Sequence, residues 1–270
     1  MLHVLCRRAV RVTPERSAQS LVIQTRDTIK VPDTVYYSIP LCELTDPNDL
    51  TRGFDVVATG TLLEVEDERF AVTANHVFDE YAPKDLLYPT SLDGLTTFGG
   101  TALTLDPRLA EVDGPARNID IAALRIGKPV HSEYLYLNAS QFAPHAPIAE
   151  GETIILQGYP LTGNKTMPRS RAIRTRKREI EGVALNHAEY TGLGLSPDIH
   201  LAVRIDPDGL PRLQGMSGGP MWLRAPAGLG LAGIITDNPP EALDVVFGTR
   251  IGVISGALAE LAKHLQPPSV

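Results

Sequence analysis

The residues best suited to covalent chemistry lie in a glycine-rich segment, Gln214–Pro220, which reads QGMSGGP. Glycines on both sides of Ser217 allow positive φ angles and close backbone packing. Such a backbone can turn two N–H groups toward one point beside the serine hydroxyl. Acyl transfer needs this combination of a nucleophile and preorganised donors for the oxyanion. Alone, the segment is equally compatible with an ordinary glycine–serine turn.

A nucleophilic serine needs a neighbouring base, and a histidine base needs a carboxylate to orient it. Among seven histidines, His76 stands out because it follows a β-like run and precedes a short helical turn in AVTANHVF. Asp120 begins DIAAL, so this acid is attached directly to an apolar strand. Each has a commoner role on its own, as a structural histidine or as a solvated acid at a strand start. With Ser217 they supply base, acid and nucleophile in the order His, Asp, Ser.

These fragments together resemble the trypsin/chymotrypsin-like serine peptidases over about residues 50–265. Three segments match well, namely TANHV at 73–77, DIAAL at 120–124 and GMSGGP at 215–220. Three match more weakly, namely TGTLL at 59–63, GYP at 158–160 and GIIT at 233–236. The resemblance implies a serine endopeptidase whose cleft lies between two six-stranded antiparallel β-barrels, followed by a C-terminal α-helix.

By position, the resemblance makes His76 the general base, Asp120 its orienting carboxylate and Ser217 the nucleophile. The backbone N–H groups of Gly215 and Ser217 would form the oxyanion hole. Four residues are expected at the substrate pocket: Pro211, Arg212, Gln214 and Thr236. Thr236 also falls near the position whose hydroxyl helps hold the aspartate in this family. No cofactor is implied, and no group of residues has metal-ligand spacing.

Three positions depart from the pattern of secreted members of this family. Val77 replaces the cysteine that commonly follows the histidine, and Met216 replaces the aspartate that pairs with a newly cleaved N-terminus. Pro211 stands where trypsin-like enzymes place an acidic pocket floor, which disfavours a Lys/Arg-selecting pocket. The chain is thus similar to the bacterial-type, intracellular branch, and we expect activity without N-terminal processing. Met216 leaves open how the serine loop is ordered.

The elements that must position these residues read as short strands. The 23 glycines and 22 prolines in 270 residues indicate many turns, which favours an all-β chain. The expected strands are 54–65, 68–74, 120–126, 153–157, 199–205, 220–223, 230–236, 243–247 and 250–254. One amphipathic helix is predicted over Ser255–Leu265, with Ser255 as its N-cap.

The order of these runs divides the chain into four parts. Residues 1–30 are mixed in character and form an N-terminal arm, and residues 31–140 form the first barrel, with His76 and Asp120. Residues 141–254 form the second barrel, with Ser217, and residues 255–270 form the C-terminal helix and tail. A proline-rich stretch over 142–147 lies near the boundary between the barrels.

The net charge of −7 argues against a general nucleic-acid-binding surface. The run from Lys165 to Arg178 is nevertheless basic and contains no acid, which suggests a docking patch for an acidic partner. The run lacks aromatic residues for base stacking, so nucleic acid is not expected there. The two cysteines, Cys6 and Cys42, read as reduced thiols. With no signal-peptide pattern and no long apolar window, we expect a cytoplasmic protein without membrane contact.

Two further motifs match known patterns. Gly215–Gly219 matches the G-x-S-x-G nucleophile elbow, but that fold requires alternating helices and strands and a histidine last in order. GLGLAG at 228–233 matches a dinucleotide-binding pattern but leads into a strand, so a hairpin is expected. The alternative that stays open is a non-catalytic or conditionally active protease-like module that binds peptides or proteins, in which a collapsed oxyanion loop silences a complete triad.

Overall fold

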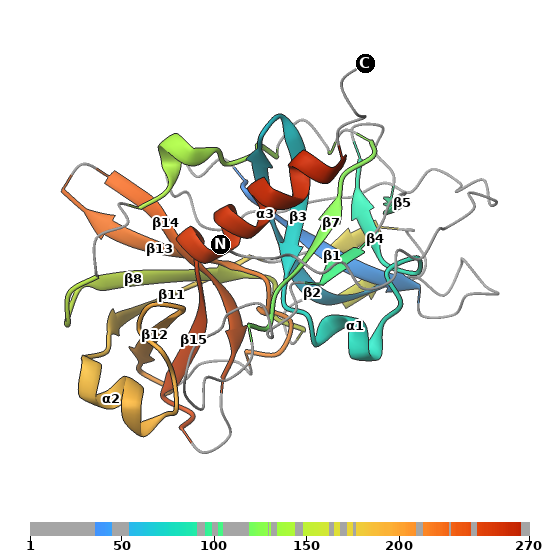
Figure 1. Cartoon of the computed structure of the whole chain (residues 1–270). Helices are drawn as coiled ribbons and strands as arrows, with labels where there is room; N and C mark the ends of the chain where they lie inside the picture. Colours follow the sequence, from blue (N-terminus) through green and yellow to red (C-terminus); the bar gives the residue numbers. More distant parts are fainter. Residues whose placement is uncertain are drawn as a thin grey trace.

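The computed structural model confirms an all-β chain with a C-terminal α-helix (Figure 1). It describes fourteen stretches of the 270-residue chain: 36–44, 54–90, 95–98, 102–104, 119–128, 130, 134–143, 148–161, 165–167, 172–174, 177–208, 213–226, 228–238 and 242–265. The predicted N-terminal arm over 1–30 lies outside the described residues. Two antiparallel β-structures lie side by side in Figure 1, with α3 running across both.

The first structure is a seven-stranded sheet of order β5-β4-β1-β2-β3-β7-β6. Its strands are β1 (Ser38–Leu44), β2 (Phe54–Val65), β3 (Glu68–Thr73), β4 (Leu87–Pro89), β5 (Leu95–Thr97), β6 (Ala102–Thr104) and β7 (Ala122–Arg125), and α1 (Val77–Glu80) follows β3. Within the described residues this sheet does not close, because its edge strands β5 and β6 do not pair with each other. The prediction of two closed six-stranded barrels therefore holds only for the second.

The second structure is a closed antiparallel barrel of order β11-β12-β15-β14-β13-β8. Its strands are β8 (Thr153–Gly158), β11 (Arg178–Ala184), β12 (His200–Ile205), β13 (Pro220–Ala225), β14 (Gly228–Asp237) and β15 (Val245–Arg250). Three short elements accompany it: the 3-10 helix η2 (Ala139–Gln141), the ribbon of β9 (Lys165–Met167) and β10 (Ala172–Arg174), and α2 (His187–Gly192). The glycine-rich GLGLAG segment lies in the predicted hairpin, where β13 pairs with β14.

The C-terminal helix α3 (Ile251–Leu265) begins four residues earlier than predicted, directly after β15. The expected strand over 250–254 is therefore wrong, and so is the N-cap at Ser255. The β-branched Ile251 and Ile254 suggested a strand, yet together with Leu258 they extend the apolar stripe of the helix at helical spacing. No helix in the described part of the chain is long and apolar enough to cross a membrane.

The buried face of α3 joins the two β-structures into one core. Ile251, Ile254 and Leu258 belong to a cluster that also holds Phe70 of β3 and Trp222 of β13. The indole N–H of Trp222 donates to Gln157 Oε1 at 2.9 Å, so the buried indole is paired. Packing of α3 against both structures limits their relative movement, which matters because the candidate site residues come from both.

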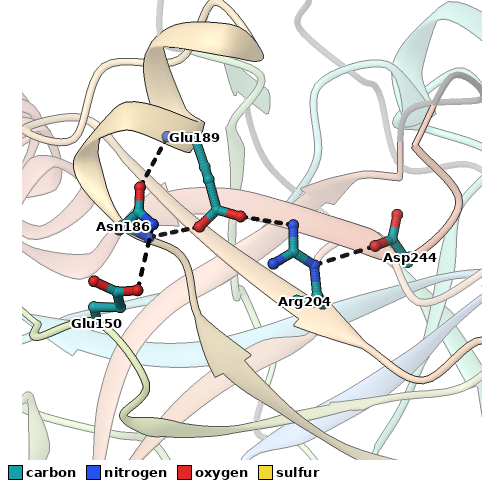
Figure 2. Close-up of polar contacts among 5 residues, drawn as sticks. All are labelled: Glu150, Asn186, Glu189, Arg204 and Asp244. Atoms are coloured by element: carbon teal, nitrogen blue, oxygen red, sulfur yellow. Dashed lines mark hydrogen bonds and ion pairs between the residues drawn. The ribbon is translucent and has the colours of Figure 1, made fainter.

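A surface network holds α2 against the barrel (Figure 2). Asn186 caps α2 and exchanges hydrogen bonds with Glu189, whose carboxylate lies 2.7 Å from Arg204 of β12. The Arg204 guanidinium also donates to Asp244, before β15, at 3.2 Å. The backbone N–H of Asn186 and then Arg204 lower the pKa of the Glu189 carboxyl. The network thereby ties the 242–244 turn to β12.

Candidate active site

His76 and Asp120 form a two-point hydrogen-bonded pair. Asp120 Oδ2 accepts from His76 Nδ1 at 2.6 Å, and Oδ1 accepts from the His76 backbone N–H at 2.8 Å. The topology creates this pair because β3 and β7 are antiparallel neighbours with Thr73 opposite Ala122. His76 follows β3 and Asp120 precedes β7, so both lie at the same edge of the sheet. With Nδ1–H donated to the carboxylate, the neutral ring keeps its lone pair on Nε2.

The electrostatic surroundings of His76 favour the imidazolium. The hydrogen bond to Asp120 raises the pKa of His76, while partial burial of the ring opposes the shift. The carboxylates of Asp120, Asp237 and Asp79 raise the pKa further. The ring is half exposed, at 45%, against 26% for the Asp120 side chain. The imidazole is therefore accessible to a ligand and is a stronger base than a solvated histidine.

The serine loop depends on glycine at two positions. Gly215 and Gly218 have φ angles of +91° and +88°, a region that other residues rarely adopt. A Cβ at Gly218 would overlap the Thr59 carbonyl oxygen and would lie 2.8 Å from Thr73 Cα. The loop therefore rests directly on the strand that leads to His76, three residues beyond Thr73.

Two threonines of β2 anchor this loop, and neither is among the predicted site residues. Thr59 Oγ1 donates to the Gly215 carbonyl at 2.8 Å, and Thr61 Oγ1 donates to the Gly218 carbonyl at 2.7 Å. The backbone N–H of Thr59 donates to the Ser217 carbonyl at 3.0 Å. The only sequence signal for these anchors was the weak TGTLL match.

Met216 anchors the serine loop through burial of its apolar side chain. Its side chain is 1% exposed and belongs to the core cluster of the barrel. The order of the serine loop thus comes from apolar burial and threonine hydrogen bonds rather than from an ion pair at position 216. This answers the question that the sequence left open.

Two backbone N–H groups of the loop are uncommitted. Gly215 N–H and Ser217 N–H donate to no other described residue, whereas Met216, Gly218 and Gly219 donate to Leu213, Ile235 and Met216 carbonyls. Because C=O and N–H of a trans peptide point in opposite directions, the Gln214 carbonyl, which accepts from Leu161 N–H at 2.9 Å, directs Gly215 N–H away from Leu161. An oxyanion requires such preorganised donors, and among the described residues these two N–H groups of the loop are available for that role.

Ser217 is partly buried, and no hydrogen bond joins its hydroxyl to His76 in the part of the chain that the structure describes. The loop that carries Ser217 nevertheless lies against Thr73, which is three residues before His76. Catalytic hydrogen bonds are often long in ligand-free active sites and tighten when substrate binds.

A cavity of about 530 Å³ borders Ser217. Most of its lining residues are apolar, and four of these lie on barrel strands: Leu156, Ile205, Ile235 and Val246. Its polar lining residues besides Ser217 are Gln214, Asp237 and Asn238. Asp237 lies in the cavity lining, and its charge also contributes to the raised pKa of His76.

Of the four residues expected at the substrate pocket, the structure places only Gln214 in the cavity lining. Pro211 and Arg212 lie outside the described residues. Thr236 is 1% exposed and absent from the lining, and its hydroxyl donates to the Phe247 carbonyl at 3.3 Å rather than to Asp120. The pairing irregularity between Ile235 and Asp237 accompanies this burial. The neighbouring Asp237 and Asn238 line the cavity instead and were not predicted.

The remaining predictions concern other parts of the surface and core. Cys42 is a free, buried thiol, and burial raises its pKa, while Cys6 lies outside the described residues. Within the described residues, no group of His, Cys, Asp and Glu could hold a metal ion. Residues 168–171 and 175–176 of the basic run are not described, and Lys177 Nζ lies 4.9 Å from the Tyr36 ring centroid. Docking of an acidic partner on this run stays a prediction.

The chain matches no protein-family model and has no significant match among curated proteins. The class that the described residues define is therefore a structural one: an all-β chain with a closed barrel that carries a glycine-flanked serine and an open sheet that carries a histidine–aspartate pair. The function has to be argued from this geometry.

Proposed function

We propose that the chain is a serine endopeptidase with a trypsin/chymotrypsin-like arrangement, in which the open sheet corresponds to the first barrel and the closed barrel to the second. The observation that carries the proposal is the docking of the serine loop on β2 and on β3, the strand that leads to the histidine–aspartate pair. Thr59 and Thr61 of β2 and Thr73 of β3 make these contacts, and the two N–H groups of the loop that have no partner among the described residues flank Met216.

In the proposed reaction, Ser217 Oγ attacks the scissile carbonyl while His76 Nε2 takes the hydroxyl proton. The imidazolium is stabilised by Asp120 through Nδ1–H, and the carbonyl oxygen, now an oxyanion, accepts from Gly215 and Ser217 N–H. His76 then gives its proton to the leaving amine as the C–N bond breaks. A water molecule, deprotonated by His76, attacks the resulting ester, and Ser217 leaves with that proton.

The test is covalent labelling with a simple fluorophosphonate, which reacts with an activated serine. We expect a single adduct that peptide mass mapping places on Ser217, and no adduct in Ser217→Ala. Ser255→Ala, on α3 and remote from the loop in sequence, is the matched serine control and should label like the wild type. The wild type should also cleave an unfolded protein substrate, with loss of cleavage in Ser217→Ala.

The missing hydroxyl–histidine hydrogen bond favours one alternative function, a conditionally active or non-catalytic module that binds peptides. That module would bind a peptide at the cavity while Ser217 stays unlabelled. Peptide binding without any Ser217-dependent labelling, with or without added peptides, would replace the peptidase proposal by this alternative.

A further inference from the structure

The cavity beside Ser217 is chemically uneven, with an apolar interior and a polar mouth. Leu156, Ile205, Ile235 and Val246 are each at most 4% exposed and belong to the barrel core cluster, so the cavity wall is continuous with the core. An apolar cavity of about 150 Å³ is large enough for benzene. At about 530 Å³, this cavity has room for a leucine or phenylalanine side chain and part of the attached backbone.

One rim residue extends this apolar surface into solvent. Leu243 lines the cavity although its residue surface is 64% exposed. Isolated exposed leucines are common and need no explanation. Leu243 differs from them because it lies at the cavity rim and its backbone is held by hydrogen bonds. Asn238 Nδ2 donates to the Leu243 carbonyl at 3.3 Å and to the Val245 carbonyl at 2.6 Å. These bonds fix the backbone from the leucine carbonyl to Val245.

The next residue completes that support. Asp244 carries the Arg204 contact seen in Figure 2, and its carbonyl accepts from Ile205 N–H at 2.8 Å. The leucine is therefore presented by a turn that is attached to β12 and to Asn238. With the Leu243 side chain held at its rim, the apolar cavity is a preformed site for an apolar group.

The charge at the mouth is negative among the described lining residues. Asp237 is exposed, and its Oδ1 accepts from the Asn238 N–H at 2.8 Å, which orients the carboxylate. An acidic ligand side chain would meet this charge, and any charged side chain would lose water on entering the apolar interior. Both effects favour an uncharged, apolar occupant.

We propose that this cavity receives the side chain of the substrate residue that contributes the scissile carbonyl, and that it selects a bulky apolar side chain such as leucine or phenylalanine. This inference rests on the proposed function. The substrate side chain is attached next to the carbonyl carbon that Ser217 attacks. Because Ser217 itself borders the cavity, this side chain is the part of the substrate that lies nearest to it. Substrates are then proteins or peptides cleaved after leucine or phenylalanine.

The test uses aminoalkyl diphenyl phosphonates that carry the same reactive group and the side chain of Ala, Leu, Phe, Lys or Glu. Each phosphonate modifies Ser217 with loss of phenol, and the second-order rate of modification is measured. The Leu analogue should react about 60-fold faster than the Ala analogue, since it buries three more carbons at about fourfold each. The Lys and Glu analogues should react more slowly than the Leu analogue.

Exposed positions provide variants that leave the core intact. Leu243→Asp should lower the Leu/Ala rate ratio about fivefold, whereas Leu229→Asp, at a 44% exposed leucine outside the cavity lining, should leave the ratio unchanged. Asp237→Asn keeps the acceptor for Asn238 N–H and should raise the Glu/Leu rate ratio about threefold, as expected for an exposed charge pair. Asp198→Asn is its control at an exposed acid outside the lining.

Equal rates for the Leu and Ala analogues, or a Lys or Glu analogue that reacts fastest, would overturn the proposed specificity. The fluorophosphonate, which carries no amino-acid side chain, separates this failure from that of the peptidase function. Labelling by fluorophosphonate without side-chain preference removes only the specificity. Absence of both reactions removes the proposed function itself.

Discussion

Replacing Thr59 with valine tests whether the hydroxyl of β2 holds the serine loop. Valine keeps the β-branched shape and the strand preference of threonine but removes the hydroxyl. That hydroxyl is fully buried, donates to the Gly215 carbonyl at 2.8 Å and accepts from the Tyr159 N–H at 2.9 Å. The substitution therefore removes two hydrogen bonds with little change in side-chain volume.

The expected cost follows from the two groups that lose this partner. A buried donor or acceptor left without its hydrogen bond costs about 1–3 kcal/mol, so Thr59→Val should lower the free energy of unfolding by about 2–6 kcal/mol. The movement of Gly215 should also slow fluorophosphonate labelling of Ser217. Loss of one oxyanion donor lowers rates by about 10²–10³-fold, which sets an upper bound for this effect.

The assay is urea unfolding followed by the fluorescence of Trp222, the single tryptophan, which is buried between the barrel and α3. With a denaturant slope of about 3 kcal/mol per molar, the midpoint should fall by about 0.7–2 M. Thr249→Val is the matched control, because the Thr249 hydroxyl is buried and has no hydrogen-bond partner among the described residues. Its removal should be neutral or stabilising. If the two variants have the same midpoint, the anchoring role of Thr59 is refuted.

Four other perturbations have defined outcomes. Protonated His76 stabilises the fold below a pH of about 6.5. This stabilisation is lost as the pH rises through the raised pKa of His76 in the folded protein. Labelling of Ser217 rises over the same pH range, because the neutral ring is the base. Asp120→Asn should move the labelling profile to lower pH and slow labelling about 10³–10⁴-fold, and an unchanged profile would contradict the pairing. Gly218→Ala should abolish labelling because its Cβ overlaps the Thr59 carbonyl oxygen, while Gly256→Ala, with open space around the added Cβ, should retain it. Asn186→Ala should destabilise α2 by about 1 kcal/mol, measured as faster amide exchange in α2 with unchanged labelling of Ser217.

Much of the local structure could be read from the sequence. Alternating and continuous apolar runs between turn residues located β2, β3, β8 and β12 to within one or two residues. The short helical turn after His76 and the hairpin at GLGLAG were also predicted. The error at the start of α3 arose because isoleucines suit both a strand and the buried face of a helix, and only contact with β14 and β15 decides between them.

The sequence by itself determined the residue types of the candidate site and their order, because glycine, serine, histidine and aspartate carry their chemistry wherever they stand. Only the tertiary structure decided how that site is assembled. The bonds from Thr59 and Thr61 to the serine loop join residues 156 and 157 positions apart, and no local pattern encodes such a pairing. The same holds for the open first sheet and for Asp237 and Leu243 at the cavity, since strand closure and pocket lining depend on contacts between distant segments rather than on the preferences of each segment.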